Sequence, residues 1–250
     1  MTTNAKIRPL RPAVVTVGDE LVLGEKHNGN QMWLLQTLWK LNQPARVSVS
    51  LPDDVDSIAR WVAYLVNENY FPILVSGGIG GTHDDCTREG IAKGLDVPIT
   101  RHDECHRILE DRYGVNFTPQ RQRMALLPQG CELIDNAIGA PGFSLRGVYA
   151  FPGFPNMLQP MANAVLTRVF PDLSASVWIT REAVLATAEG NIAEAVEAFG
   201  QTYTQARVGI YPSAERFGRQ VTVRIRVPPN SESVLNAFDE LVKTLENEIK

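Results

Sequence analysis

The chain has 250 residues, of which 44% are hydrophobic and 21% are charged, and its net charge at pH 7 is -4. This composition is typical of a globular protein, and the length allows one large or two modest domains with a sizeable core. The acidic balance, with an isoelectric point near 5.6, argues against a general nucleic-acid binder.

The three cysteines show no CxxC spacing, which favours free thiols in a reducing compartment. The N-terminal stretch MTTNAKIRPLRP lacks the apolar run of a signal peptide. We find no apolar run near the length of about 18 residues that a membrane-spanning helix requires. We therefore expect a cytoplasmic protein that neither spans nor binds a membrane.

Strands and helices are expected to alternate through the first two thirds of the chain. Residues 13–17 (AVVTV) form a continuous apolar run, which is typical of a strand buried on both faces. The later expected elements are helices at 30–41, 55–68, 85–94 and 101–113, strands at 46–51, 72–76 and 147–151, and a helix ending near 168. This alternation predicts an α/β fold with three layers, in which helices cover both faces of a parallel sheet.

A second, smaller domain is expected at the C-terminal end. Pro171 and Asp172 mark a possible boundary, which predicts domains at 1–172 and 173–250. Strict alternation of apolar and polar residues at 220–227 indicates a strand with one solvated face. The other expected elements are strands at 176–187 and 207–212 and helices at 191–199 and 232–249. The order β-α-β-β-α predicts a small α+β domain.

Carboxylates follow each of the first three predicted strands. The pairs are Asp19 and Glu20, Asp53 and Asp54, and Asp84 and Asp85. Ligands of open α/β sheets bind at the carboxyl ends of the strands, so these pairs are expected to share one rim. The alternative is that each pair starts the following helix, with Thr82 and Asp85 as a capping box.

The segment SGGIGGTHDDC (76–86) combines a glycine-rich turn with two of these acids. Consecutive glycines let backbone N–H groups converge on an oxyanion, and a following helix adds its positive end. Two like charges 4 Å apart repel by ~4 kcal/mol at an effective dielectric of 20. A divalent cation that bridges carboxylate and phosphate oxygens resolves this conflict, which predicts Mg²⁺ held by Asp84 and Asp85. The alternative is a ligand that offers hydroxyl or amino donors to one of the aspartates.

Neither common phosphate-binding fingerprint is present. His83 stands where GxGxxG requires its third glycine, and GxxxxGK[ST] does not occur. His102 and His106 have the i, i+4 spacing of a metal-binding helix, but their polar surroundings favour a solvated helix face. Cys86 follows the glycine turn, and we interpret it as a filler rather than a nucleophile because no base is recognisably paired with it.

Several stretches resemble a known family: GDELVLGEKHNGN, LPDD, SGGIGGTHDDCTREGIA, NAIGAPGF and FPGFPNM. They are similar to the molybdopterin-binding domain family, and most of all to the CinA-type proteins and the related domain fused to eukaryotic FAD synthases. The resemblance covers about residues 13–170, and the small C-terminal domain is also similar to the one that follows in CinA-type proteins. Two departures are Gly81 in place of a proline and Met157 in place of an acid.

The resemblance implies either binding and activation of molybdopterin or metal-dependent hydrolysis of nucleotide pyrophosphates such as ADP-ribose. It places the family's acids on Asp85, Asp53, Asp19 and Glu20, which we expect to be catalytic, and its paired asparagines on Asn28 and Asn30. The expected ligand-binding residues are Gly18, Asn28, Asn30, Gly77, Gly78, Gly80, Gly81, Thr82, Pro152 and Gly153.

The first hypothesis is a divalent-metal-dependent hydrolase of a nucleotide pyrophosphate, either ADP-ribose or an FAD-like molecule. The second is a molybdopterin-binding protein of molybdenum-cofactor assembly, and the third is a non-catalytic module that binds a nucleotide or pterin. All three predict a small-molecule partner rather than a nucleic acid. We also expect a homodimer or homotrimer, because related folds commonly self-associate.

Overall fold

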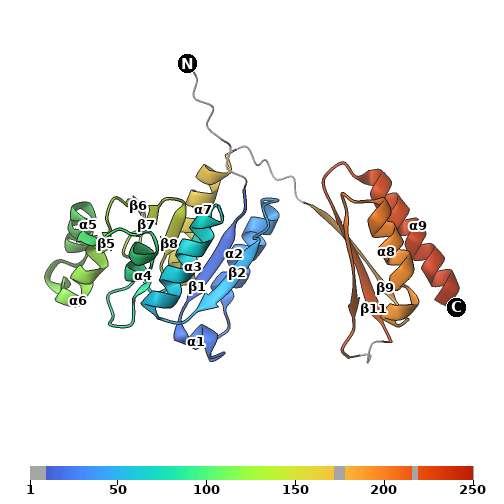
Figure 1. Ribbon diagram of the computed structural model, residues 1–250, viewed down its shortest axis with the longest axis horizontal. Helices are drawn as coiled ribbons and strands as arrows, with labels where there is room; N and C mark the ends of the chain where they lie inside the picture. Colours follow the sequence, from blue (N-terminus) through green and yellow to red (C-terminus); the bar gives the residue numbers. More distant parts are fainter. Residues whose placement is uncertain (1–9, 172–177, 216–218, 250) are drawn as a thin grey trace, which may run out of the picture. The chain divides into compact units, whose positions relative to one another are not determined.

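A larger α/β unit and a smaller α+β unit make up the chain (Figure 1). The computed structural model describes residues 10–171, 178–215 and 219–249. The units comprise Met1–Ser174 and Ala175–Lys250. The expected boundary between residues 172 and 173 lies outside the described residues. None of the described helices has both the length and the apolar character needed to cross a membrane.

The larger unit is built on a six-stranded sheet in the order β2-β1-β3-β8-β7-β6. Its strands are β1 (Ala13–Val17), β2 (Val47–Leu51), β3 (Ile73–Ser76), β6 (Glu132–Ile134), β7 (Gly142–Leu145) and β8 (Val148–Phe151), and a separate antiparallel pair is formed by β4 (Ile99–Arg101) and β5 (Leu126–Pro128). The first four strands in the sheet order are parallel. The expected strands of this unit are confirmed to within one residue at each end.

The sheet is mixed rather than wholly parallel, because β7 is antiparallel to β8 and β6 is antiparallel to β7. The turn between β7 and β8 contains Arg146 and Gly147, both with positive φ (51° and 89°). Two adjacent residues with positive φ match the tight turns of β-hairpins. An arginine in such a turn is a weak sequence signal, and the sequence analysis did not predict β7.

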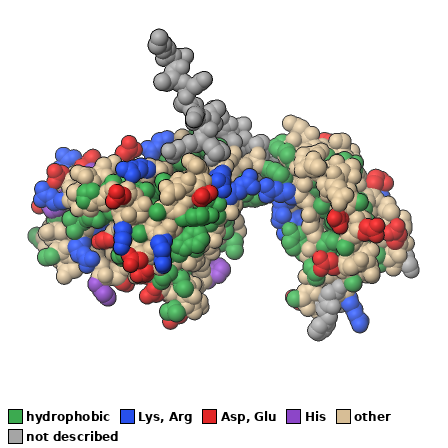
Figure 2. Space-filling view, in the orientation of Figure 1, with side chains coloured by type: hydrophobic (Ala, Val, Ile, Leu, Met, Phe, Trp, Pro, Cys, Tyr) green, Lys and Arg blue, Asp and Glu red, His purple; other side chains and the backbone are tan. Residues whose placement is uncertain are grey.

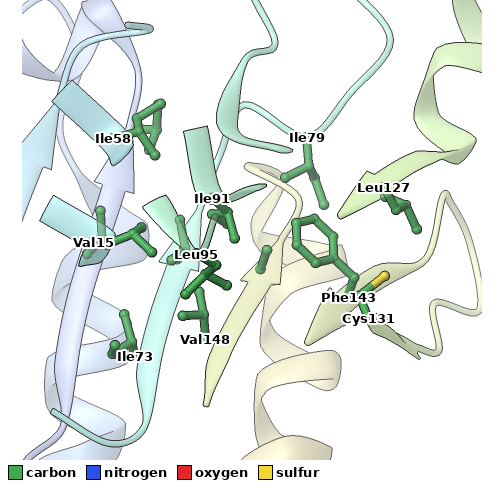
Figure 3. Packing of buried hydrophobic residues seen from close by; sticks show 14 of the residues in the cluster. Val15, Ile58, Ile73, Ile79, Ile91, Leu95, Leu127, Cys131, Phe143 and Val148 are labelled. Atoms are coloured by element: carbon green, nitrogen blue, oxygen red, sulfur yellow. The ribbon is translucent and has the colours of Figure 1, made fainter. Parts of the chain in front are cut away.

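Helices cover both faces of this sheet, which confirms the three-layer arrangement. The helices are α1 (Asp19–Val22), α2 (Gly29–Lys40), α3 (Val55–Asn67), α4 (Thr87–Gly94), α5 (Asp103–Tyr113), α6 (Pro119–Gln122) and α7 (Pro155–Val169), with 3-10 turns at Gly114–Asn116 (η1) and Arg123–Ala125 (η2). Successive strand residues point to opposite faces. Val15 therefore packs in the core with α3, α4 and α5, whereas Val14 packs with α2 and α7 (Figure 3 shows part of the first core).

The order of the strands places a crevice at the ends of β1 and β3. From β1 the chain moves to β2 on one side and then returns to β3 on the other side of β1. The connections after β1 and β3 therefore diverge, and such a switch point is where open α/β sheets bind ligands. The glycine-rich segment follows β3 directly, so it borders this crevice.

The smaller unit is an antiparallel sheet in the order β10-β11-β9 with two helices. Its elements are β9 (Ile179–Leu185), α8 (Ala193–Thr202), β10 (Arg207–Pro212), β11 (Val221–Val227), α9 (Glu232–Ile249) and a 3-10 turn at Glu189–Asn191. The alternating valines and isoleucine of β11 are fully buried and share a core with Phe199 and Phe238. The expected β-α-β-β-α order is confirmed.

Candidate ligand-binding site

A cavity of about 720 Å³ lies in the larger unit at the carboxyl ends of β1, β3 and β8. Its lining includes these predicted residues: Gly18, Glu20, Asn28, Asn30, Asp53, Gly77, Gly78, Gly80, Gly81, Thr82, Asp84, Asp85, Pro152 and Gly153. Asp19 is the one predicted residue that does not line it. The sequence analysis did not select several other lining residues, among them Lys26, Tyr113, Met124, Phe154 and Met157.

Asp85 closes the glycine-rich loop on itself. Its Oδ1 accepts a hydrogen bond from the amide of Gly80 (2.8 Å), and its Oδ2 accepts one from the amide of Thr82 (2.8 Å) and contacts the Thr82 hydroxyl. The N-cap residue of α4 is Cys86, whose side chain makes no capping bond. The capping-box alternative for Thr82 and Asp85 is therefore wrong: the bond from the Thr82 amide to Asp85 is half of such a box, but α4 begins only at Thr87, so the pair closes the loop rather than capping the helix.

Gly77 and Gly78 both need to be glycine. Each has a positive φ (100° and 67°), which side chains rarely tolerate. A Cβ on Gly77 would lie 2.3 Å from the carbonyl oxygen of Val17, and one on Gly78 would lie 2.3 Å from Oγ1 of Thr87. The backbone of the loop thus comes very close both to the end of β1 and to the start of α4.

The loop also offers hydrogen-bond donors to the cavity. Within residues 10–171, the amides of Gly78, Ile79 and Gly81 have no acceptor. All three residues line the cavity. Converging free amides at a strand end, followed by a helix N-terminus, form the arrangement that binds oxyanions.

Ile79 anchors this loop to the core. It is 5% exposed and belongs to the cluster that contains Phe143 of β7 (Figure 3). From the sequence, the loop was expected only to supply backbone donors. The signal that it missed was a single large apolar residue in a run of glycines, which is typical of a loop fixed by one buried side chain.

Asp19 and Asp53 hold the ends of β1 and β2 together. The amide of Asp19 donates to Oδ2 of Asp53 (2.9 Å), and the amide of Asp53 donates to Oδ1 of Asp19 (3.0 Å). Burial raises the pKa of Asp53, and the Asp19 amide partly offsets that effect. Asp54 caps α3 through the amide of Ser57 (2.7 Å), as the capping alternative predicted for this pair.

Asn28 and Asn30 differ in whether their side-chain amides are fully hydrogen-bonded within the protein. Asn28 caps α2 through the amide of Gln31, and its Nδ2 donates to Thr16 Oγ1 (2.8 Å) and Ser50 Oγ (3.0 Å). Its side chain therefore serves the fold. Asn30 donates from Nδ2 to Ser76 Oγ (3.0 Å) and to the carbonyl of Gly153 (2.7 Å), but its buried Oδ1 has no partner among the described residues.

Glu20 lies over Gly18 at the mouth of the cavity. A Cβ on Gly18 would lie 2.6 Å from Oε2 of Glu20. The same carboxylate is 3.9 Å from Nζ of Lys26, and both side chains are substantially exposed. Exposed pairs of this kind contribute little to stability, so both groups are available to a ligand.

Part of the cavity lining is apolar, and we call these residues the apolar wall. It includes Tyr113, Met124, Phe154 and Met157. A Cβ on Gly139 would lie 2.8 Å from both Sδ and Cε of Met157, so the thioether lies directly on this part of the backbone. A planar heterocycle suits such a wall, because its ring faces are apolar and polarizable sulfur packs well against rings.

The predicted magnesium ligands do not form a ready-made cation site. In the part of the chain that the structure describes, no group of three or more His, Cys, Asp or Glu side chains could hold a metal ion. Both oxygens of Asp85 already accept hydrogen bonds from the loop, and one oxygen of Asp53 accepts from Asp19. A cation at this rim would depend on oxygens that a ligand brings.

The other reactive side chains are structural. Burial raises the pKa of Cys86 to about 11, so its thiol is protonated at neutral pH. His102 caps α5 by accepting from the amide of Cys105, and His106 packs edge-on against Phe117. Lys, Arg, Asp and Glu side chains are interspersed on the face of the larger unit seen in Figure 2.

Comparison with known proteins identifies relatives of both units. The family model described as a probable molybdopterin binding domain matches residues 13–172. A protein of Metallosphaera sedula is 35% identical over 167 residues, which are 62% of this chain and 63% of that protein. A protein of Aeropyrum pernix is 29% identical over 246 residues, which are 94% of this chain and 91% of that protein.

A CinA-like protein of Anaeromyxobacter sp. is 36% identical over 163 residues, but the match is 62% of this chain and 40% of that protein. Among solved structures, the crystal structure of the protein CinA with unknown function from Thermoplasma acidophilum is 29% identical and has a TM-score of 0.59. That match covers 64% of this chain and 99% of the other.

Proposed function

The chain belongs to the CinA-type branch of the molybdopterin-binding domain family, and from this premise we propose that its cavity binds a pterin that carries a phosphate group. Two halves of the cavity support the proposal. Free amides of the glycine-rich loop suit the phosphate, and the apolar wall with Phe154 and Met157 suits the heterocycle.

The unpaired Oδ1 of Asn30 is the observation that carries the proposal. Both Nδ2 hydrogens of this residue are committed, one of them to the carbonyl of Gly153, which can only accept. The orientation of the amide is therefore determined, and Oδ1 is left as a buried, unpaired acceptor on a residue that lines the cavity. An unpaired buried acceptor costs about 1–3 kcal/mol, so a ligand that donates an N–H there regains this energy. A pterin carries such donors on its ring edge.

Replacing Asn30 tests this assignment. We expect Asn30→Ala to weaken binding of neopterin monophosphate at least tenfold in isothermal titration calorimetry, because an N–H of the ring loses its acceptor. Gln31→Ala is the matched control: Gln31 lies next to Asn30 on α2, donates to Ser48 (2.8 Å) and does not line the cavity. No measurable binding by the unchanged protein would refute the proposed function.

The comparisons favour pterin binding over the nucleotide pyrophosphatase, which the sequence analysis placed first. Hydrolysis of ADP-ribose or FAD stays a prediction, and so does its dependence on Mg²⁺. Release of AMP in the presence of Mg²⁺, Mn²⁺ or Co²⁺ would support it. Binding of neopterin monophosphate without cleavage of a pyrophosphate would support the pterin-binding protein. Unchanged affinities and activities in Asp85→Ala would support the non-catalytic alternative, which Met157 in place of an acid also favours.

Self-association also stays a prediction. Light scattering coupled to size-exclusion chromatography measures the mass of the particle directly. A mass of two or three times 27.6 kDa would support the expected homodimer or homotrimer.

A further inference from the structure

The cavity carries an excess of negative charge that a phosphate must overcome. Four carboxylates line it, those of Glu20, Asp53, Asp84 and Asp85, whereas Lys26 is the one Lys or Arg in its lining. Unit charges of like sign repel strongly at short range. A phosphate-bearing ligand therefore needs a compensating positive charge close to the loop.

Arg88, on the first turn of α4, is a buried cation immediately behind this loop. Its side chain is 1% exposed, and it is the largest fully buried side chain among the described residues. A guanidinium keeps its proton under physiological conditions even where burial lowers its pKa, as it does here. Burying such a charge is costly unless it is fully paired, so its presence calls for an explanation.

The fold only partly satisfies the guanidinium of Arg88. Nη1 donates to the carbonyl of Arg123, Nη2 donates to the carbonyl of Asp85 (3.4 Å), and Nε has no partner among the described residues. Oε1 of Glu89 forms an ion pair with Nη2 at 3.9 Å but no hydrogen bond, and Glu89 is the strongest of the charges that act on the guanidinium. The other charges that act on it are those of Asp85 and Arg123, which oppose each other.

The partners of Arg88 belong to two segments that are separate in the sequence. Asp85 closes the glycine-rich loop, whereas Arg123 begins η2, whose next residue, Met124, lines the apolar wall. A Cβ on Gly81 would lie 2.2 Å from the carbonyl of Gln120, so the loop also touches the segment that leads into η2. One guanidinium thus connects the end of the loop to η2 and places a positive charge beside the Asp85 carbonyl.

We propose that Arg88 supplies the positive charge that lets this acidic cavity accept a phosphate, so that binding requires no divalent cation. The inference rests on the proposed function, because it concerns the phosphate of the same ligand. It replaces the expectation that Mg²⁺ reconciles the carboxylates with the phosphate. Arg88 acts as a positioning residue, because it does not line the cavity and reaches the ligand only through the loop and its field.

The test compares a charged ligand with its uncharged analogue. Affinities of neopterin monophosphate and neopterin are measured by isothermal titration calorimetry for the unchanged protein, Arg88→Met and Arg88→Lys, each with EDTA and with Mg²⁺. For the unchanged protein we expect equal affinity for the phosphate in both conditions. Arg88→Met should bind neopterin monophosphate at least tenfold more weakly, a loss of about 1.4 kcal/mol, but bind neopterin as before. Arg88→Lys, which keeps the charge, should recover most of the loss.

Arg146→Met is the matched control. Its Nη1 donates to the carbonyl of Leu95 at the other end of the same helix, so this variant also removes an arginine–carbonyl bond from α4. We expect it to leave both affinities unchanged.

Failure of the inference differs from failure of the proposed function. If the unchanged protein binds the phosphate only with Mg²⁺, or if Arg88→Met weakens both ligands equally, Arg88 is not the compensating charge and the inference is overturned. The Mg²⁺ comparison needs no variant, so it decides the matter even if Arg88→Met does not fold. If the unchanged protein binds neither ligand, the proposed function itself falls.

Discussion

Single residues at the rim have roles that their chemistry alone does not reveal. Asp53, Asp54 and Asp85 follow predicted strands in similar surroundings, yet one pairs with the amide of Asp19, one caps a helix and one closes a loop. Each carboxylate accepts from the backbone N–H groups nearest to it in space. The predicted pH dependence of stability therefore has opposite signs for Asp53 and Asp54.

Removing the carboxylate of Asp85 should loosen the glycine-rich loop. Asp85→Ala leaves the amides of Gly80 and Thr82 without their acceptor, and we expect the free energy of unfolding to fall by about 1–2 kcal/mol. Asp84→Ala removes the same charge from an exposed neighbour and should change stability by less than about 0.5 kcal/mol. Urea unfolding measures both, and equal losses would contradict this role for Asp85.

The pH dependence of stability should separate Asp53 from Asp54. Burial raises the pKa of Asp53 in the folded protein above its unfolded value of 3.8. The protonated side chain therefore stabilises the fold at pH values below 3.8, and this stabilisation is lost as pH rises through the folded pKa. The charged Asp53 is therefore unfavourable at pH 7. Asp53→Asn, which keeps an acceptor for the Asp19 amide, should be more stable than the unchanged protein at pH 7, and this advantage should shrink towards pH 4.

Asp54 should behave in the opposite way and serves as the control. The hydrogen bonds from Ser57 lower its pKa, so its stabilising effect is present above the unfolded value and is lost as pH falls through the folded pKa. Asp54→Asn should therefore reduce stability at pH 7 and matter less at low pH. Urea unfolding at pH 7 and pH 4 measures how the stability of each variant changes with pH. Changes of the same sign in both variants would contradict the prediction.

At the scale of elements, the hydrophobic pattern predicted the helices and central strands well. Strands β1, β2, β3 and β8 and helices α2, α3, α5 and α7 lie within about two residues of their expected positions, because their length contains enough apolar residues to show a period. Strands β4, β5, β6 and β7 were not predicted. Each has three or four residues and, because a polar residue, Pro or Gly interrupts it, a shorter apolar run than the similarly short β3 and β8.

Helices α3 and α4 pack closely because α4 carries glycines at their contact. A Cβ on Gly90 would lie 2.6 Å from both Cβ and Cγ2 of Ile58, and one on Gly94 would lie 2.7 Å from the carbonyl of Ala59. Cβ of Ile58 moves only with its backbone, so relief of this contact would require α3 or α4 to shift. The glycines therefore decide how closely α4 and the loop before it approach the core.

Gly90→Ala should destabilise the protein by about 1–3 kcal/mol through overpacking, even though alanine is the better helix former. Gly29→Ala is the control, because a Cβ at Gly29 of α2 meets nothing within 4 Å. That change should be neutral or stabilise by up to about 1 kcal/mol. A stabilised Gly90→Ala variant in thermal unfolding would show that α3 and α4 are less tightly packed than described.

At the scale of the whole molecule, the larger unit should contain all that ligand binding needs. Every residue that lines the main cavity lies between Thr16 and Met157. The smaller unit has its own core around Val223, Phe199 and Phe238. Each unit therefore has the buried apolar surface that an independent domain requires.

A fragment of residues 10–171 should bind neopterin monophosphate with an affinity within about twofold of the full chain, a difference below about 0.5 kcal/mol. A fragment of residues 178–250 should show no binding under the same conditions. Isothermal titration calorimetry of both fragments checks this expectation. Cooperative unfolding of the 10–171 fragment would show that it is folded. If such a folded fragment bound neopterin monophosphate much more weakly than the full chain, the smaller unit would contribute to binding.

The sequence alone determined most of the local elements, their layering and the place of the candidate site. Periodic apolar residues, caps and glycine turns act between neighbours in the chain, so they can be recognised without knowing the fold. The tertiary structure alone decided which polar groups meet: Asp19 with Asp53, Asp85 with its own loop, and Arg88 with the carbonyl of Asp85. It also decided that Oδ1 of Asn30 is buried without a partner among the described residues. These partners depend on the directions of side chains and on burial, and long-range hydrogen bonds leave no periodic trace in a single sequence.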